Sequence, residues 1–296
     1  AKVDDKIIHG PSYFSDDCQP GLCADCCGAW GGPKIISQEL INEHKIYLFD
    51  KNQSQPLWSY DVGKNWVTSV AISADSDKIA TADNQGNLYL FNLDSNQPIW
   101  IFTAEPDPNA EDVEGFDKGK VAFSNNGYLL AGLKGNVYLF KIDNQIPIWQ
   151  YNVGMTLNEV TISQDGQYIA AGGMDTKVYF WQTDNSEPVW VYKVVSEGGM
   201  LGGSVIRSMD MTPDGQYIVA GTSCPDRSVY VFSKEQSEPI FRSQAGSNFP
   251  VETISITDDG QYVLAAGGGS YEDPFSSLLY KVCLLYTSDA ADELDG

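Results

Sequence analysis

The residues best suited to chemistry lie in a cysteine-rich stretch near the start of the sequence. Cys18, Cys23, Cys26 and Cys27 place four thiols within ten residues. The Cys23-x-x-Cys26 spacing is typical of zinc ligands, and the other two thiols would complete a tetrahedral set. We favour a loop closed by one or two disulfides, because adjacent cysteines rarely bind one ion and long loops gain most from cross-linking. Disulfides here would indicate an extracellular or cell-surface location.

An acidic stretch offers a second possible site, for calcium. Residues 104–119 read AEPDPNAEDVEGFDKG. The stretch fails the EF-hand pattern, because Asp112 stands where that loop needs glycine and Lys118 where it needs glutamate. A solvated acidic loop is therefore the interpretation we favour. The candidate calcium ligands are Asp107, Glu111, Asp112 and Glu114.

Catalysis by a nucleophile and a histidine base has little support in the sequence. The two histidines, His9 and His44, both lie near the start of the chain, so chain order suggests no Ser-His-Asp set. The glycine-rich stretches at 198–203 and 267–269 lack the following helix with Lys and Ser or Thr that a phosphate-binding loop requires. We therefore expect no catalytic residue and no cofactor, and predict that the protein is not an enzyme.

The composition narrows the class of partner. The 296 residues include 18 basic and 40 acidic ones, for a net charge of −22, which would repel nucleic acid and anionic membrane surfaces. No apolar run approaches the roughly 20 residues of a membrane-spanning helix. Aromatic residues make up 12% and charged residues only 20%, as suits an ordered, turn-rich chain. The composition therefore predicts an all-β protein that does not bind nucleic acid.

One unit recurs five times and predicts the fold. Each copy has an apolar stretch like KIYLF, a proline seven residues after its last aromatic residue, and another aromatic residue two positions later. Two more apolar stretches, like VTIS and YIAAG, precede it, and Asp-Gly pairs mark tight turns. Four short strands repeated about every 46 residues indicate a β-propeller of four-stranded antiparallel blades. We call these strands a, b, c and d.

The repeats cover most of the sequence. We expect a propeller over 1–282, with six blades visible: the first has strands b to d, four are complete, and the last has strands a to c. An insert at 9–42 separates strands b and c of the first blade. We expect this to be part of a seven- or eight-bladed ring. Residues 283–296 depart from the repeat and resemble a translated sequencing adapter, so we expect a non-native tail.

The unit resembles two families of propeller repeat. Its strand order and its Ser-x-Asp-Gly turns, such as that at 163–166, are similar to WD repeats of archaeal or bacterial type, although the signature Trp-Asp pair is absent. The stretch GNLYLFNLDSNQPIW (86–100) resembles the pyrroloquinoline-quinone repeat of quinoproteins. In that family the strand-d aromatic residues dock neighbouring blades. The resemblance assigns this role to Trp58, Trp100, Trp149, Trp190 and Phe241.

The quinoprotein resemblance also leaves an enzyme alternative. The adjacent Cys26 and Cys27 are similar to the vicinal disulfide of some quinone-dependent alcohol dehydrogenases. Nothing in the sequence marks the catalytic aspartate or calcium ligands that such an enzyme needs. A structural cell-surface module that self-associates is a further alternative.

The positions of the insertions favour a binding function. Strands b–c and d–a are joined on one face of a propeller, and the long connections all belong to these two types: 9–42, 103–120, 194–205, 222–228 and 267–277. A rigid frame that carries long loops on one face is typical of binding proteins. We therefore predict a non-catalytic scaffold that binds a protein or glycan. The candidate contact residues are Trp30, Trp66, Phe116, Tyr271 and Phe275.

Overall fold

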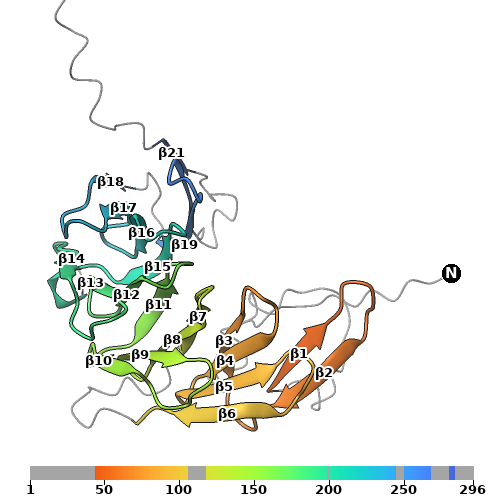
Figure 1. Ribbon diagram of the computed structural model, residues 1–296. Coiled ribbons are helices and arrows are strands. Elements are labelled where there is room, and N and C mark those ends of the chain that lie inside the picture. The colour runs from red at the N-terminus through yellow and green to blue at the C-terminus, as the bar shows by residue number, and fades with distance from the viewer. Residues whose placement is uncertain (1–43, 106–117, 199, 245–249, 268–279, 284–296) are drawn as a thin grey trace, which may run out of the picture. The chain divides into compact units, whose positions relative to one another are not determined.

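The described strands form antiparallel sheets in which each strand pairs with its neighbours in sequence (Figure 1). The computed structural model describes residues 44–105, 118–198, 200–244, 250–267 and 280–283. All of them belong to one compact unit that begins at His44. The sheets are numbered below as blades 1 to 6 in chain order.

The strands of the blades have the following bounds. Blade 1 has β1 (Lys45–Phe49) and β2 (Pro56–Asp61). Blade 2 has β3 (Val67–Ile72), β4 (Lys78–Asp83), β5 (Asn87–Asn92) and β6 (Pro98–Thr103). Blade 3 has β7 (Lys120–Phe123), β8 (Tyr128–Leu133), β9 (Asn136–Lys141) and β10 (Trp149–Asn152).

Blades 4 to 6 continue this order. Blade 4 has β11 (Leu157–Ile162), β12 (Tyr168–Gly173), β13 (Lys177–Gln182) and β14 (Trp190–Lys193). Blade 5 has β15 (Ile206–Met211), β16 (Tyr217–Thr222), β17 (Ser228–Ser233) and β18 (Phe241–Gln244), preceded by the short 3₁₀ helix η1 (Met200–Gly202). Blade 6 has β19 (Val251–Ile256), β20 (Tyr262–Gly267) and β21 (Tyr280–Cys283).

Blades 2 to 5 confirm the predicted four-stranded antiparallel blades. Blade 1 is described from strand c onward, so the predicted strand b and the insert at 9–42 lie outside the described residues. β21 ends at Cys283, the first residue of the stretch predicted to be a non-native tail. The other residues of that stretch are not described.

The place of the repeated proline differs from the prediction in three blades. Pro56 and Pro98 open β2 and β6, as expected for strand d. β10, β14 and β18 instead begin two residues after their prolines, at the aromatic residue. A proline has no N–H to donate to the neighbouring strand, so the regular pairing begins after it.

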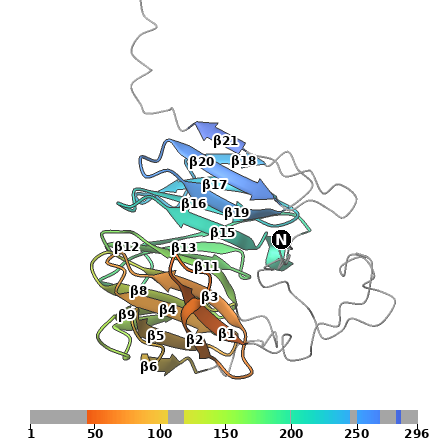
Figure 2. The ribbon, with the colours of Figure 1, turned by 90° about the vertical axis from the view of Figure 1, so that its right-hand side faces the viewer.

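The blades have the radial arrangement of a β-propeller. The a strands of consecutive blades lie next to each other, β3 beside β7, β7 beside β11, β11 beside β15, and β15 beside β19. Figure 2 shows the sheets of blades 5 and 6 stacked face to face, and buried residues of both blades share one apolar cluster. Because blades 2 to 5 each have a neighbour on both faces, their middle strands are apolar on both sides, as β5 (NLYLFN) illustrates.

A tryptophan from strand d joins each of four blades to the next. The Trp100 ring packs against Phe140 with centroids 5.7 Å apart, and Phe102 adds edge contacts to Tyr138 and Phe140 at 5.0 and 5.1 Å. Each indole N–H also donates to a backbone carbonyl just beyond strand c of the next blade. These bonds join Trp58 to Leu93 (2.8 Å), Trp100 to Ile142 (3.2 Å), Trp149 to Thr183 (2.8 Å) and Trp190 to Lys234 (3.2 Å).

The fifth aromatic residue of this series has no donor. Phe241 packs against the apolar cluster between blades 5 and 6, which includes Val251 and Val263. A phenyl ring can fill the same wedge between sheets but cannot bond the neighbouring carbonyl. The junction between blades 5 and 6 therefore lacks the hydrogen bond of the other four.

The Asp-Gly turns also contact the preceding blade. Gly215 has φ +67°, and a Cβ there would lie 2.5 Å from Cδ2 of Tyr168. Gly63 has φ +82° but nothing within 4 Å of a Cβ. We expect Gly215→Ala to lower the free energy of unfolding by about 3 kcal/mol, against about 1 kcal/mol for Gly63→Ala, which adds backbone strain alone. Urea denaturation checks this, and equal losses would contradict the close packing of the turn.

Candidate functional site

The strand order divides the connections between two faces. Because neighbouring strands are antiparallel, the b–c and d–a connections leave from one end of the strands, and the a–b and c–d turns from the other. We call the first the loop face and the second the turn face. All the predicted insertions belong to the loop face, and most of 9–42, 103–120 and 267–277 lies outside the described residues.

Trp66 is an exposed side chain on a firmly held loop. It lies in the connection between β2 and β3 and exposes 47% of its surface. Its N–H donates to Oδ1 of Asn84 (2.8 Å), and its carbonyl accepts from the Asn84 N–H (2.9 Å). Asn65 donates from Nδ2 to Oδ2 of Asp83 (2.8 Å). Three hydrogen bonds therefore fix the loop that carries Trp66 to the b–c turn of blade 2.

The Asp83 side chain holds that turn together by accepting hydrogen bonds. Its side chain is buried and accepts hydrogen bonds from Asn65 and Asn87 Nδ2 (both 2.8 Å), from the Tyr89 hydroxyl (3.1 Å), and from the N–H groups of Gln85 and Asn87 (both 2.9 Å). Burial, together with the charge of Asp83, raises the pKa of Tyr89, which stays protonated as a donor. The carboxylate is used fully as a structural acceptor.

Blades 4 and 5 have a related carboxylate at the same end of the sheet. Asp175 accepts from the Tyr179 hydroxyl (2.6 Å), and burial raises the pKa of Asp175 although this hydrogen bond opposes the change. Asp226 forms an ion pair with Arg242 and accepts from the Thr222 hydroxyl (2.8 Å). These carboxylates fix the b–c turns of their blades.

The connection between β14 and β15 carries two more exposed apolar side chains. Val195 and Leu201 expose 71% and 57% of their surfaces. Val195 forms a bridge with Gly203, and the Lys193 ammonium donates to the Leu201 carbonyl (3.0 Å). The loop is therefore held at both ends while its apolar side chains face solvent.

Polar pairs join the a strands of neighbouring blades. Lys120 of β7 lies 3.1 Å from Oε2 of Glu159 in β11. Burial raises the pKa of Glu159, and the Lys120 charge opposes that change. Asp210 of β15 accepts from the Ser255 hydroxyl of β19 (2.9 Å). These contacts stabilise the order of the blades.

Most other candidate residues lie in parts of the chain that the structure does not describe. Cys224, in the b–c connection of blade 5, is exposed and forms no disulfide within the described residues. Trp66 is the candidate contact residue that the structure places, on the loop face. The candidates outside the described residues are Trp30, Phe116, Tyr271, Phe275, Cys18, Cys23, Cys26, Cys27, Asp107, Glu111, Asp112 and Glu114.

Metal-binding clusters and membrane-spanning helices are both absent from the described ranges. Among those residues, no group of three or more His, Cys, Asp and Glu side chains is placed to hold a metal ion. No helix in the same ranges is long and apolar enough to cross a membrane.

Comparison with known families agrees with the blade geometry. The family described as WD domain, G-beta repeat (WD40) matches the chain at residues 54–92, 154–182 and 198–233. Three stretches of the chain are similar to WD40 repeats. They cover β2 to β5, β11 to β13, and η1 with β15 to β17. No curated protein matches the chain. With the four-stranded sheets, the match supports a β-propeller of WD-repeat type.

Several residues of the loop face were missed by sequence reasoning. Asp83 ends strand b and Asn84 follows it, at a position where we expected turn residues and not a buried acceptor. Val195 and Leu201 lie within the predicted insertion at 194–205. That insertion contains no aromatic residue, so no contact residue was predicted in it. In blades 2, 4 and 5 an Asp shortly before strand c is followed by a Tyr within that strand. This repeated Asp–Tyr pair is a sequence signal from which the buried carboxylates could have been predicted.

Proposed function

We propose that this protein is a non-catalytic scaffold that binds a protein partner through its loop face. WD40 repeats generally serve as scaffolds for protein interactions. The observation that carries the proposal is Trp66, an exposed indole whose backbone is bonded in both directions to Asn84. A large side chain on a rigid base loses little conformational entropy on binding and is typical of an interface anchor.

The loop between β14 and β15 extends the proposed surface. Val195 and Leu201 are apolar and exposed, and their loop is held to blades 4 and 5 by backbone contacts. Exposed apolar side chains gain from being covered by a partner. Asn65 and Asn84 adjoin Trp66, and Gln85 follows Asn84, so their side-chain amides can orient a ligand beside the indole. A glycan is the alternative ligand class for the same amide and indole groups.

Binders selected from a random peptide library test the proposal. We expect peptides selected on the wild-type protein to bind Trp66→Ala and Leu201→Ser about tenfold more weakly, because interface anchors dominate binding energy. The control is Ile99→Ser, which removes an apolar side chain, 44% exposed, from the outer strand β6. Equal binding to all three variants would place the interface elsewhere. A glycan array screened with the same variants separates the two ligand classes.

The quinone-dependent enzyme alternative has its own test. Addition of pyrroloquinoline quinone with calcium is expected to produce no change in visible absorbance and no alcohol oxidation. A stoichiometric spectral change with activity would overturn the scaffold proposal.

The extracellular or cell-surface location is part of the proposal, and resistance of the four N-terminal cysteines to alkylation without reduction would support it. A structural module would instead self-associate without a partner.

A further inference from the structure

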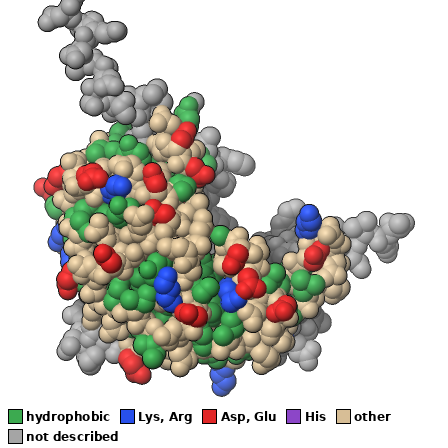
Figure 3. Space-filling view, in the orientation of Figure 1, with side chains coloured by type: hydrophobic (Ala, Val, Ile, Leu, Met, Phe, Trp, Pro, Cys, Tyr) green, Lys and Arg blue, Asp and Glu red, His purple; other side chains and the backbone are tan. Residues whose placement is uncertain are grey.

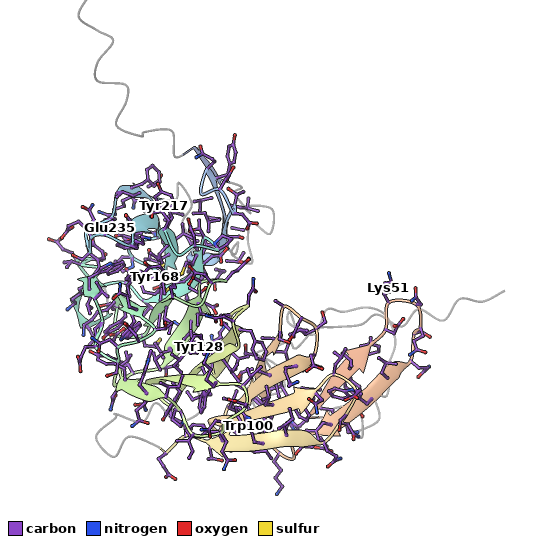
Figure 4. All side chains as sticks on the ribbon, in the orientation of Figure 1. Lys51, Trp100, Tyr128, Tyr168, Tyr217 and Glu235 are labelled. Atoms are coloured by element: carbon purple, nitrogen blue, oxygen red, sulfur yellow. The ribbon has the colours of Figure 1, made fainter. Side chains whose placement is uncertain are left out.

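The outer strand of blade 2, β6, presents an apolar row to solvent. β6 is the last strand of its sheet, and within the described residues no strand pairs with its outer side. Figure 4 marks Trp100 in the middle of this strand. Trp100 and Phe102 pack toward blade 3, whereas Ile99 and Ile101 expose 44% and 45% of their surfaces. Figure 3 shows hydrophobic side chains along the lower rim of the view, where β6 runs in Figure 1.

The backbone of Ile101 points outward as well. In an antiparallel pair, residues bonded to the neighbouring strand alternate with residues whose N–H and C=O point away from it. The Ala104 N–H donates to the Gly86 carbonyl (2.9 Å), which fixes this alternation along β6. Ile101 and Thr103 therefore direct their N–H and C=O groups away from β5. At the other end the alternation stops at a bulge, in which Ile99 has no partner in β5.

The corresponding edges of the other blades are protected against pairing with another chain. Charged and amide side chains on an edge strand oppose the addition of a further strand. Each of those edges has such a side chain at one or both of the positions that Ile101 and Thr103 occupy in β6. In blades 1, 3, 4 and 5 these positions hold Ser59 and Asp61, Gln150 and Asn152, Val191 and Lys193, and Arg242 and Gln244.

The charges beside β6 indicate the chemistry of a strand that would fit. β6 itself contains no charged residue, and residues 105–117, which follow it, include six acidic residues and no basic one. Glu105 is exposed and continues the alternating row of Ile101 and Thr103. Lysine or arginine at that end of an added strand would be attracted to this stretch. A second copy of the chain fits less well, because each copy has a net charge of −22.

We infer that the β6 edge binds an extended segment of a partner protein, which adds to blade 2 as a fifth strand. The segment has apolar residues at alternate positions and a basic residue at the end beside Glu105. Backbone hydrogen bonds to Ile101 and Thr103 provide affinity, and the exposed Ile101 side chain selects apolar neighbours. This edge lies on the rim of the blade and does not depend on the function proposed for the loop face.

Amide hydrogen exchange of the free protein tests whether the edge is open. We expect the Ile101 and Thr103 amides to exchange at least about tenfold faster than those of Trp100 and Phe102, which are bonded to β5. Sedimentation under the same conditions should show a monomer. Equal protection of all four amides would overturn the inference. The edge would then be covered by a second copy if the protein sediments as a dimer, and by its own chain if it is monomeric.

Binding of a synthetic peptide tests the proposed partner chemistry. The peptide has seven alternating Val and Thr residues, two lysines at each end and capped termini, and calorimetry at low salt measures its affinity. We expect Ile101→Pro to weaken binding at least about tenfold, because proline removes the outward N–H and leaves the bonds to β5 intact. Ile101→Lys keeps the backbone donor and is expected to weaken binding about fivefold through loss of the apolar contact.

The matched control is Gln150→Pro, at the same position of blade 3. It is expected to leave peptide affinity unchanged, as is Trp66→Ala on the loop face, so this test and that of the loop face can fail separately. Equal affinity of the wild type and Ile101→Pro would overturn the inference, as would equal losses in Ile101→Pro and Gln150→Pro. A peptide with glutamates in place of the lysines should not bind, and its binding would contradict the basic character of the partner.

Discussion

Replacement of Trp100 with alanine is expected to lower the free energy of unfolding by about 4 kcal/mol. The Trp100 side chain is only 9% exposed and fills the wedge between blades 2 and 3, where its ring meets Phe140. Its removal would leave a cavity between the two sheets. It would also remove the indole donor to the Ile142 carbonyl. Both losses act on the same junction, so we expect one of the largest effects of any single substitution.

The neighbouring residue supplies a matched control. Ile99 lies next to Trp100 in β6 but points outward, with 44% of its surface exposed. Ile99→Ala is expected to change the free energy of unfolding by less than about 1 kcal/mol. Urea denaturation followed by circular dichroism measures both. Similar losses for the two variants would mean that the tryptophan does not join the blades.

Replacement of Asp83 with alanine is expected to destabilise the fold by about 3 kcal/mol. The change removes the common acceptor of donors on Asn65, Asn87, Tyr89 and Gln85. A buried donor that has lost its acceptor is no longer solvated by water either, and this lowers the free energy of unfolding. Because Asn65 is one of them, the loop that carries Trp66 should also become more mobile.

Two variants test whether the loss comes from the hydrogen bonds of the buried Asp83 carboxylate or from the loss of a negative charge. Asp83→Asn keeps one acceptor oxygen but brings an NH₂ group toward other donors, so we expect about half the loss of Asp83→Ala. Asp94→Ala removes an exposed carboxylate from a c–d turn and is expected to change stability by about 0.5 kcal/mol or less. Equal effects of Asp83→Ala and Asp94→Ala in thermal denaturation would contradict the buried network.

The blades were predictable because their signals are local and repeated. Asp-Gly pairs such as Asp165-Gly166 mark a turn in which Asp165 accepts from the Gln167 N–H (3.0 Å) and Gly166 adopts φ +69°. The Pro-x-Trp spacing located the outer strand of blades 1 to 4 to within two residues. The indole hydrogen bonds to the next blade depend on how two sheets stack. No spacing within one repeat reveals them.

The candidate site was predictable only in outline. The sequence placed Trp66 in a d–a connection, and antiparallel pairing puts that connection on the loop face. The Asn84 contacts that fix Trp66 join residues 18 positions apart, and each is a common turn residue with no distinguishing pattern. The Tyr217 ring contacts a turn of the next blade, at Gly260, in the same unpredictable way. Contacts between residues that are distant in sequence therefore define the candidate site.

Amide hydrogen exchange of the protein with a library-selected peptide tests the central claim most directly. The account predicts slower exchange in 62–66, 84–86 and 194–205, because the loop face carries the ligand. The Trp66 and Asn84 amides are the most informative reporters, since each is bonded to the other residue. Protection confined to the outer strands or to the turn face, with these loops unchanged, would contradict it.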